Sequence, residues 1–518
     1  MQKTCKNDKC IYLEENGPWL SSLGDVYEFY EQSLSSNTVS PQTYGFEVEF
    51  YALQQQSDYA GHLANVAQVQ RVLDDLKVSN TDSSDAVYTL DLAQQLEFAS
   101  APRDSITALY QHGQEAEQLL QKTTERHGLR PSALSVHPSA NWSDPDYINH
   151  IDQELISDER TQLVIPCFQR SIDSAKQPYS AHDLLATCGI HTTFAIHNKI
   201  VLEETLTLFG AVTSLIAAAN HASPFSYFEN AQNSVRELLW DASLTRSDNR
   251  FGLPPQLSGA VTLDDVITHI INQPMWYGID QYNNLHEIAK PVTFADLIRT
   301  GGIHLDDTFI APTLEQYINH SRTCYNSYRV KPTFAADGMM CLTEFRIPDG
   351  GGMGKAVMNV ALIHGLTHSA EARGQFRQIL ERYGLLDVTD SKQDAYERNK
   401  ILQQNLLKNS LYGTTLPYRG ETAITVWQEI IDLACHELSA KEDTPEIQQV
   451  LNKLQATTYV SEAEQHRKSL QRLDIDPQQL SKPHYADKLD LLTGYAQFGE
   501  YYELPPARVL YHRAGDGR

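Results

Sequence analysis

The chain has 518 residues, of which 41% are hydrophobic and 9% aromatic, and its formal net charge is −25. This length predicts roughly two to four structural units, and the apolar content suffices for a packed core rather than a disordered chain. The acidic balance argues against a nucleic acid partner, because phosphate backbones are bound by basic surfaces. It remains compatible with a local basic pocket for a nucleotide.

Neither a secretory signal nor a membrane span is expected. Residues 1–6 and their neighbours lack the apolar stretch of a signal sequence. The most apolar segment, residues 206–219, is too short to cross a bilayer. The seven cysteines include no C-x-x-C pair, which is typical of reduced thiols. Together these features predict a cytoplasmic protein with no membrane partner.

Strands alternate with helices through the first two-thirds of the chain. Helical periodicity predicts a short helical lead-in over residues 1–40. It also predicts helices over 60–77, 104–127, 201–220 and 262–272. Extended segments are expected over 45–50, 87–91, 95–102, 129–142, 187–197 and 341–349. Beyond residue 355 the pattern is almost entirely helical to near residue 500, with one interruption at 413–420. This order favours an α+β fold with a largely antiparallel sheet flanked by helices.

The first strand carries two carboxylates on one face. In Gly45-Phe46-Glu47-Val48-Glu49-Phe50 apolar and acidic residues alternate, so the aromatic side chains can enter a core while both glutamates point away from it. Their Cα atoms lie roughly 6.6 Å apart along a strand. Two carboxylates at that spacing repel each other unless a cation lies between them. On its own, this strand is better explained as part of a sheet with a solvated acidic face.

Four more polar residues stand in apolar strand contexts further along the chain. Glu97 lies between Leu96 and Phe98, and His191 lies in the strand at 187–197. Glu344 and Arg346 are two residues apart, so they share one face of the strand at 341–349. Each could be an ordinary surface residue, and only their grouping would make them a site.

Two familiar motifs fail on inspection. The glycine-rich run Gly350 to Ala356 has the wrong spacing for a phosphate-binding loop, because Asp349 stands at the first glycine position and Ala356 replaces the required Ser or Thr. His364 and His368 are spaced as in a zinc protease helix, but Gly365 stands where that motif requires Glu.

Taken in order, these segments resemble the glutamate–cysteine ligases of the plant and proteobacterial type. More broadly they resemble the carboxylate–amine ligases with the glutamine-synthetase fold. The resemblance covers roughly residues 41–440. Its motifs are Tyr44 to Glu49, Gln95 to Pro102, Thr187 to His197, Ala222 to Phe225, Ser234 to Trp240, Pro274-Met275, Thr343 to Arg346 and Leu416 to Arg419.

The resemblance implies a chain organised in three parts. They are a helical lead-in (1–40), a glutamine-synthetase-like catalytic domain (41–355) and a mainly helical C-terminal region packed on that domain (356–518). It also implies ATP and two or three Mg²⁺ ions as cofactors, with Mn²⁺ as an alternative metal, and small-molecule amino acids as substrates. The oligomeric state stays open.

Roles for individual residues follow from the same resemblance. The implied metal ligands are Glu47, Glu49, Glu97, His191 and Glu344. Arg346 and Glu47 are implied to be catalytic, and Arg346 and Arg419 to contact the nucleotide. The residues implied to line the substrate pocket are Arg236, Thr193, Tyr277 and Trp240. The sequence departs from the family at Ala93-Gln94, where many relatives have two glycines, and at His191 and Thr193, where plant enzymes have Gln and Asn.

The implied reaction joins glutamate to cysteine or a related amine through an acyl phosphate. Two alternatives stay open. A guanidino-type kinase of the same fold would give a stable phosphorylated product, and a non-catalytic relative would bind nucleotide without turnover. The departures at His191 and Thr193 concern the substrates more than the metals.

Overall fold

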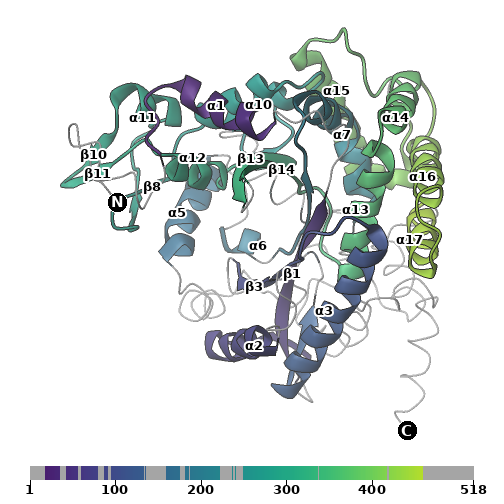
Figure 1. Cartoon of the computed structure of the whole chain (residues 1–518), viewed down its shortest axis with the longest axis horizontal. Coiled ribbons are helices and arrows are strands. Elements are labelled where there is room, and N and C mark those ends of the chain that lie inside the picture. Colours follow the sequence, from purple (N-terminus) through teal and green to yellow (C-terminus); the bar gives the residue numbers. More distant parts are fainter. Residues whose placement is uncertain are drawn as a thin grey trace.

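The computed structural model describes residues 18–34, 43–55, 60–79, 87–91, 95–132, 135, 159–174, 181–185, 187–221, 236, 240, 249–335, 338–416 and 419–458. Over these residues the protein has an α+β fold built on one large sheet, with helices against it (Figure 1). The α+β prediction is therefore confirmed.

The large sheet has eight strands in the order β13-β14-β6-β1-β4-β3, and β2 and β5 also pair with β1. Every pairing in it is antiparallel, as predicted. Its strands are β1 (Tyr44–Gln55), β2 (Ala60–Leu63), β3 (Val87–Leu90), β4 (Leu96–Ala99), β5 (Leu129–Ser132), β6 (Ile190–Ala195), β13 (Tyr328–Ala335) and β14 (Gly338–Phe345).

Alternation along β1 gives the sheet an apolar face and a polar face. Phe46, Val48 and Phe50 are buried in the main hydrophobic core, while Glu47 and Glu49 point to the other side. The pairing register extends this division, because residues directly opposite each other in an antiparallel pair share a face. Glu47 stands opposite His191 on β6, and Glu49 stands opposite Glu97 on β4.

The apolar face is covered by helices that the sequence predicts. The segment 104–127 forms α3 (Ile106–Arg126), and α13 (Met353–Thr367) contacts α3, β1 and β6 (Figure 1). The segment 60–77 was predicted as helix throughout, and this is wrong at its start, since β2 comes first and pairs with β1. The helix that follows is α2 (Val66–Ser79).

Helix α7 (Lys199–Ala219) contains the most apolar stretch of the described chain. This helix has 21 residues and contains an 18-residue window with a mean hydropathy of 1.6, so by length and composition it could cross a membrane, and the segment 206–219 is its C-terminal part. In the folded protein, however, 83% of that stretch is buried. Packing in the core accounts for its composition.

The C-terminal region is helical through residue 456, as predicted. Gly365 of α13 lets this helix approach α16, because a Cβ atom there would lie 2.7 Å from the carbonyl oxygen of Ala434. Residues 459–518 lie outside the described residues. The boundary at 355 between catalytic and C-terminal parts stays a prediction. The helices that follow α13 are α14 (Ala370–Arg382), α15 (Lys392–Gly413), α16 (Ala423–Ser439) and α17 (Pro445–Ala456).

Several elements had no counterpart among the predictions, because they are short or lack a clear period. They include the helix α5 (Glu159–Ser174) and most of the segment 277–335, which contains the start of β13.

The remaining elements, some of them predicted, are α1 (Leu23–Ser33), α6 (Ala181–Leu185), β7 (Phe251–Gly252), η4 (Pro255–Leu257), α10 (Leu263–Ile271), β8 (Tyr277–Ile279), β9 (Leu285–Glu287), α11 (Phe294–Thr300), β10 (Ile303–Leu305), β11 (Thr308–Ile310), α12 (Leu314–Ser321) and β12 (Tyr325–Asn326).

Candidate functional site

The polar face of the large sheet gathers the residues predicted as metal ligands. They come from four adjacent strands, β14, β6, β1 and β4, and they lie on the side opposite the core. They form two groups displaced along β1. The predicted ligands are Glu47, Glu49, Glu97, His191 and Glu344.

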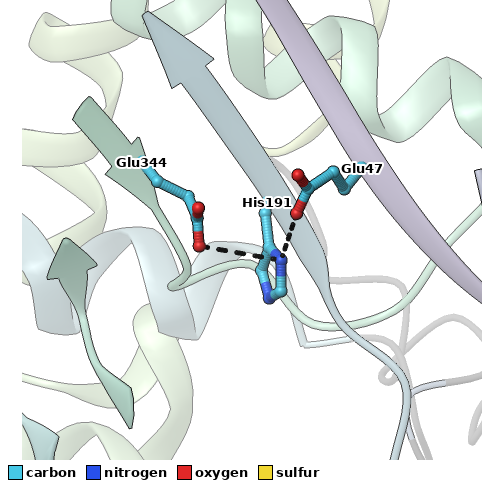
Figure 2. A group of neighbouring side chains, drawn as sticks. All are labelled: Glu47, His191 and Glu344. Atoms are coloured by element: carbon cyan, nitrogen blue, oxygen red, sulfur yellow. Dashed lines mark hydrogen bonds and ion pairs between the residues drawn. The ribbon is translucent and has the colours of Figure 1, made fainter. Parts of the chain in front are cut away.

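The first group consists of Glu47, His191 and Glu344, which converge from three strands (Figure 2). Each offers one ligand atom, and these atoms all lie within 4.8 Å of one another. Nδ1 of His191 is 3.0 Å from Oε2 of Glu47 and 3.9 Å from Oε1 of Glu344. Two carboxylates and an imidazole in this arrangement form a donor set suited to a divalent cation.

The second group consists of Glu49, Glu97 and Asp91, and its ligand atoms also lie within 4.8 Å of one another. Burial and the carboxylates of Asp91, Glu47 and Glu49 hold the pKa of Glu97 well above its usual value. Burial likewise raises the pKa of Glu49, although the backbone N–H of Gly189 donates to its Oε2 at 2.5 Å. Uncompensated charge of this kind is relieved by a bound cation.

Asp91 was not among the predicted ligands. It follows β3, in which Thr89 stands opposite Glu97. The period of two puts Asp91 on the same face as Thr89. Alternation along residues 87–91 was therefore a signal that could have identified it.

Basic side chains surround Glu344 at the end of the first group. This carboxylate is fully buried, and Arg329 Nη2 lies 2.6 Å from its Oε2. Lys331 Nζ lies 3.2 Å from the same oxygen, and Arg346 Nε lies 3.3 Å from Oε1. Although burial opposes ionisation, these three cations hold the pKa of Glu344 well below its usual value. Three positive charges around one carboxylate leave a surplus that can bind an anion.

Further basic groups lie at the same end. Arg160 of α5 and Arg322 lie close enough to Arg329 to repel it. Burial, and then the positive charges of Arg329 and Arg160, lower the pKa of Arg322. The buried Nε atoms of Arg160 and Arg329 have no hydrogen-bond partner among the described residues. Arg329 and Lys331 were missed by sequence reasoning because β13 was not predicted, although Tyr328-Arg329-Val330-Lys331 alternates in the required way.

Arg236 and Trp240 lie at the opposite end, beside the second group. Arg236 is 7% exposed, and it packs against Gly189, where a Cβ atom would lie 2.6 Å from Arg236 Nη2. Trp240 Nε1 donates to Thr187 Oγ1 at 2.9 Å. A pocket of about 40 Å³ lies here, and its lining includes Glu49, Asp91, His191, Arg236, Trp240 and Arg346.

A larger cavity of about 380 Å³ adjoins this pocket. The two spaces share Arg236, Phe251, Tyr325 and Arg346 as lining residues, and the larger one extends to α7 and α15. Neither lining includes Arg329 or Lys331. The polar face thus has a cation-rich end beside the first acidic group and a cavity end beside the second.

The other predicted substrate and nucleotide residues lie outside the two cavity linings. Thr193 stands opposite Glu344 in the strand register. Tyr277 is buried with Phe168 and Trp240 in a hydrophobic cluster next to the site. Arg419 is exposed in the turn before α16. None of the three is among the described residues that line the two cavities.

The two rejected motifs have structural roles in the fold. Nζ of Lys355 is buried and donates to the backbone oxygens of Asn220 and Gly350, so it is not presented to a phosphate. His364 packs its ring against Tyr44, and His368 Nε2 lies 3.3 Å from a carboxylate oxygen of Glu437.

One face of the antiparallel sheet thus carries two acidic groups whose donor atoms suit divalent cations, with a cluster of basic side chains beside them. Residues 43–468 match the model of glutamate-cysteine ligase family 2 (GCS2), and the chain belongs to that family. It is accordingly a member of the ATP-dependent carboxylate–amine ligases.

The other comparisons add little. No curated protein matches the chain. Among solved structures, the complex between the prokaryotic ubiquitin-like protein Pup and its ligase PafA is similar with a TM-score of 0.38 and 10% identity. That match covers 93% of this chain and 77% of the other. A similarity of this size supports no inference about function.

Proposed function

We propose that this protein joins the side-chain carboxylate of glutamate to the amine of cysteine or a related compound, with ATP as the source of energy. Family membership supports the reaction class. The observation that carries the proposal is the arrangement along the polar face. There, a basic cluster that fits a polyphosphate adjoins two acidic groups that fit divalent cations.

The reaction proceeds in two balanced steps. An oxygen of the acid's carboxylate attacks the γ-phosphorus of ATP, the bond to the β,γ-bridging oxygen breaks, and ADP leaves with the electron pair. The nitrogen of the amine then attacks the acyl carbon, the bond between that carbon and the phosphate oxygen breaks, and inorganic phosphate leaves. The nitrogen loses its proton to solvent.

The two acidic groups fit Mg²⁺, with Mn²⁺ as an alternative. Each is rich in carboxylate oxygens, and burial together with neighbouring carboxylates raises the pKa values of Glu49 and Glu97. When bound, Mg²⁺ neutralises the phosphates and orients the transferred phosphoryl group. The two groups account for two of the two or three ions that the family resemblance implies.

The positions of the basic side chains suggest a different role for each of them. Arg329 and Lys331 lie where they can bind the phosphates of ATP. Arg346 lies between the two ends, with its Nε 3.3 Å from Glu344 and 3.5 Å from Nε2 of His191, so it can stabilise charge on the phosphoryl group in transfer. Arg236 lies where it can bind a carboxylate of the amino acid substrate.

An ATP-consumption screen over pairs of acids and amines, with products identified by mass spectrometry, tests the proposal. We expect ADP, phosphate and an amide only when both substrates are present. A stable phosphorylated product formed without amine would indicate the guanidino-type kinase. Absence of turnover with every pair, together with retained ATP binding, would indicate a non-catalytic relative.

A further inference from the structure

The cavity of about 380 Å³ beyond Arg236 and Arg346 has an unusual lining for so acidic a protein. Three of its lining residues are cationic, Arg236, Arg346 and Lys400, and none is Asp or Glu. The net charge of the chain is −25. A cavity lined by positive side chains and by no negative ones favours a ligand that carries negative charge.

Helix α15 forms one wall of this cavity. The positions that face the cavity recur at helical spacing, so a single strip of the helix is presented to the ligand. That strip offers amide groups and one amine to a ligand, together with one aromatic and one aliphatic side chain. Its residues are Tyr396, Asn399, Lys400, Gln403, Gln404 and Leu407.

Polar atoms at the entrance from the active site also lack partners. Arg236 Nε and Arg346 Nη1 are buried and make no hydrogen bond to a described residue, and the hydroxyl of Tyr325 is in the same state. All three residues line both the small pocket and the large cavity. Buried donors of this kind are normally satisfied, so a bound molecule at this point accounts for them.

The position of the cavity favours the amine substrate over ATP. Phosphates belong at the Arg329 and Lys331 end, and neither residue lines the cavity. The reacting carboxylate of the acid belongs at the small pocket, whose lining includes residues of both acidic groups. The amine has to reach the acyl carbon from a neighbouring space, and among the described residues the large cavity shares lining residues with the small pocket.

We propose that the cavity between α7 and α15 binds the acceptor amine, and that this acceptor carries a carboxylate and is larger than cysteine. The inference rests on the ligase function proposed above. In this proposal, Lys400 binds the acceptor's carboxylate, and the side-chain amides of Asn399 and Gln403 bind the acceptor's other polar groups. At about 30 Å³ for each water molecule, the cavity holds roughly a dozen waters, which is more room than a single small amino acid fills. A dipeptide-sized amino carboxylate fits this description.

Binding of a matched pair of probes to the full chain tests the ligand class. Glycylglycine carries a terminal carboxylate, and glycylglycinamide differs by its neutral amide. By saturation-transfer NMR we expect glycylglycine to bind with a Kd at least about tenfold lower. The substitution Lys400→Met should abolish this difference, while Lys408→Met, an exposed position of the same helix outside the cavity lining, should preserve it. Equal binding of the two probes, or displacement of glycylglycine by ATP, would overturn the proposal.

Positional isotope exchange in ¹⁸O-labelled ATP separates this inference from the ligase function itself. The exchange requires acid and ATP but no amine, so Lys400→Met and Gln403→Leu should leave its rate unchanged while they raise the acceptor KM about tenfold or more. If these variants lose the exchange, the cavity serves the acid or ATP and the inference is wrong. If wild-type protein shows no exchange with any acid, the ligase function fails instead, and the NMR result alone decides the ligand of the cavity.

Discussion

Glu47 and His191 face each other across β1 and β6, with Nδ1 of His191 3.0 Å from Oε2 of Glu47. The other ring nitrogen of His191 accepts from Nε of Arg346 at 3.5 Å. The imidazole therefore links a carboxylate of the first acidic group to the arginine between the two ends of the site. Its orientation is fixed by both neighbours.

Replacement of Glu47 by Gln should remove a metal ligand while it keeps the size of the side chain. We expect kcat to fall roughly 100-fold or more and the Mg²⁺ concentration for half-maximal activity to rise, because one anionic oxygen is lost. A Mg²⁺ titration of initial rates measures both effects. Glu31→Gln, an exposed position on α1, is the control. Unchanged Mg²⁺ dependence in Glu47→Gln would show that the first group is not a metal site.

Asp91→Asn tests the ligand that sequence reasoning missed. Since Asp91 completes the second group with Glu49 and Glu97, the variant should bind Mn²⁺ about tenfold or more weakly. Electron paramagnetic resonance of Mn²⁺ measures the free ion and requires no turnover. Asp74→Asn, exposed on α2, should bind Mn²⁺ like the wild type. Wild-type affinity in Asp91→Asn would remove Asp91 from the site.

Lys331→Met should affect ATP far more than the amino acids. Nζ of Lys331 lies 3.2 Å from Glu344 at the cation-rich end, so we expect the KM for ATP to rise about tenfold with little change in the KM of the acid. Steady-state kinetics with each substrate varied in turn gives both values. Lys290→Met, at an exposed position, controls for loss of charge. The reverse pattern, a change confined to the acid, would contradict the assignment of the two ends.

Buried histidines make stability fall in mild acid. Burial, with Arg250 nearby, lowers the pKa of His269 to about 4 from its ordinary value of 6.5. Below pH 6.5 the unfolded chain therefore binds a proton that the folded chain does not, and the stabilisation present at neutral pH is lost down to about pH 4. The expected slope from this residue is about 1.4 kcal/mol per pH unit.

Urea unfolding at several pH values between 7.5 and 4.5 measures this slope. His320 and His364, whose pKa values burial lowers to about 3, act in the same direction. His269→Gln should be less stable than wild type at pH 7.5 but should show a smaller loss on acidification. An identical pH dependence in variant and wild type would mean that His269 does not titrate between the folded and unfolded states.

The sequence was sufficient to predict the ligands whose strands alternate clearly. Glu47, Glu49 and Glu97 stand between buried apolar neighbours, so period two identified the face that each would occupy. Their spatial grouping is a different matter, because it depends on a strand order in which β6 and β14 follow β1 across the sheet. Nothing local to His191 or Glu344 encodes that order, and only the family resemblance suggested it.

The parts that escaped prediction share a physical cause. Arg329 and Lys331 lie on β13, which pairs with the next strand in the chain, β14. The alternation of polar and apolar residues along β13 was not recognised in the sequence. The α15 wall of the large cavity comes from a helix whose polar strip resembles any solvated face. A helix of that kind reveals its role only through packing against α7 and η4.

Transfer of ¹⁸O from a labelled acid to phosphate tests the central claim most directly. With both carboxylate oxygens of glutamate labelled, an acyl phosphate delivers one labelled oxygen to each inorganic phosphate released as the amide forms. Mass spectrometry of the phosphate should therefore show one ¹⁸O atom per amide, and Glu47→Gln should lower the amounts of amide and labelled phosphate together. Unlabelled phosphate formed alongside amide, or label retained in a stable phosphorylated product, would contradict the account.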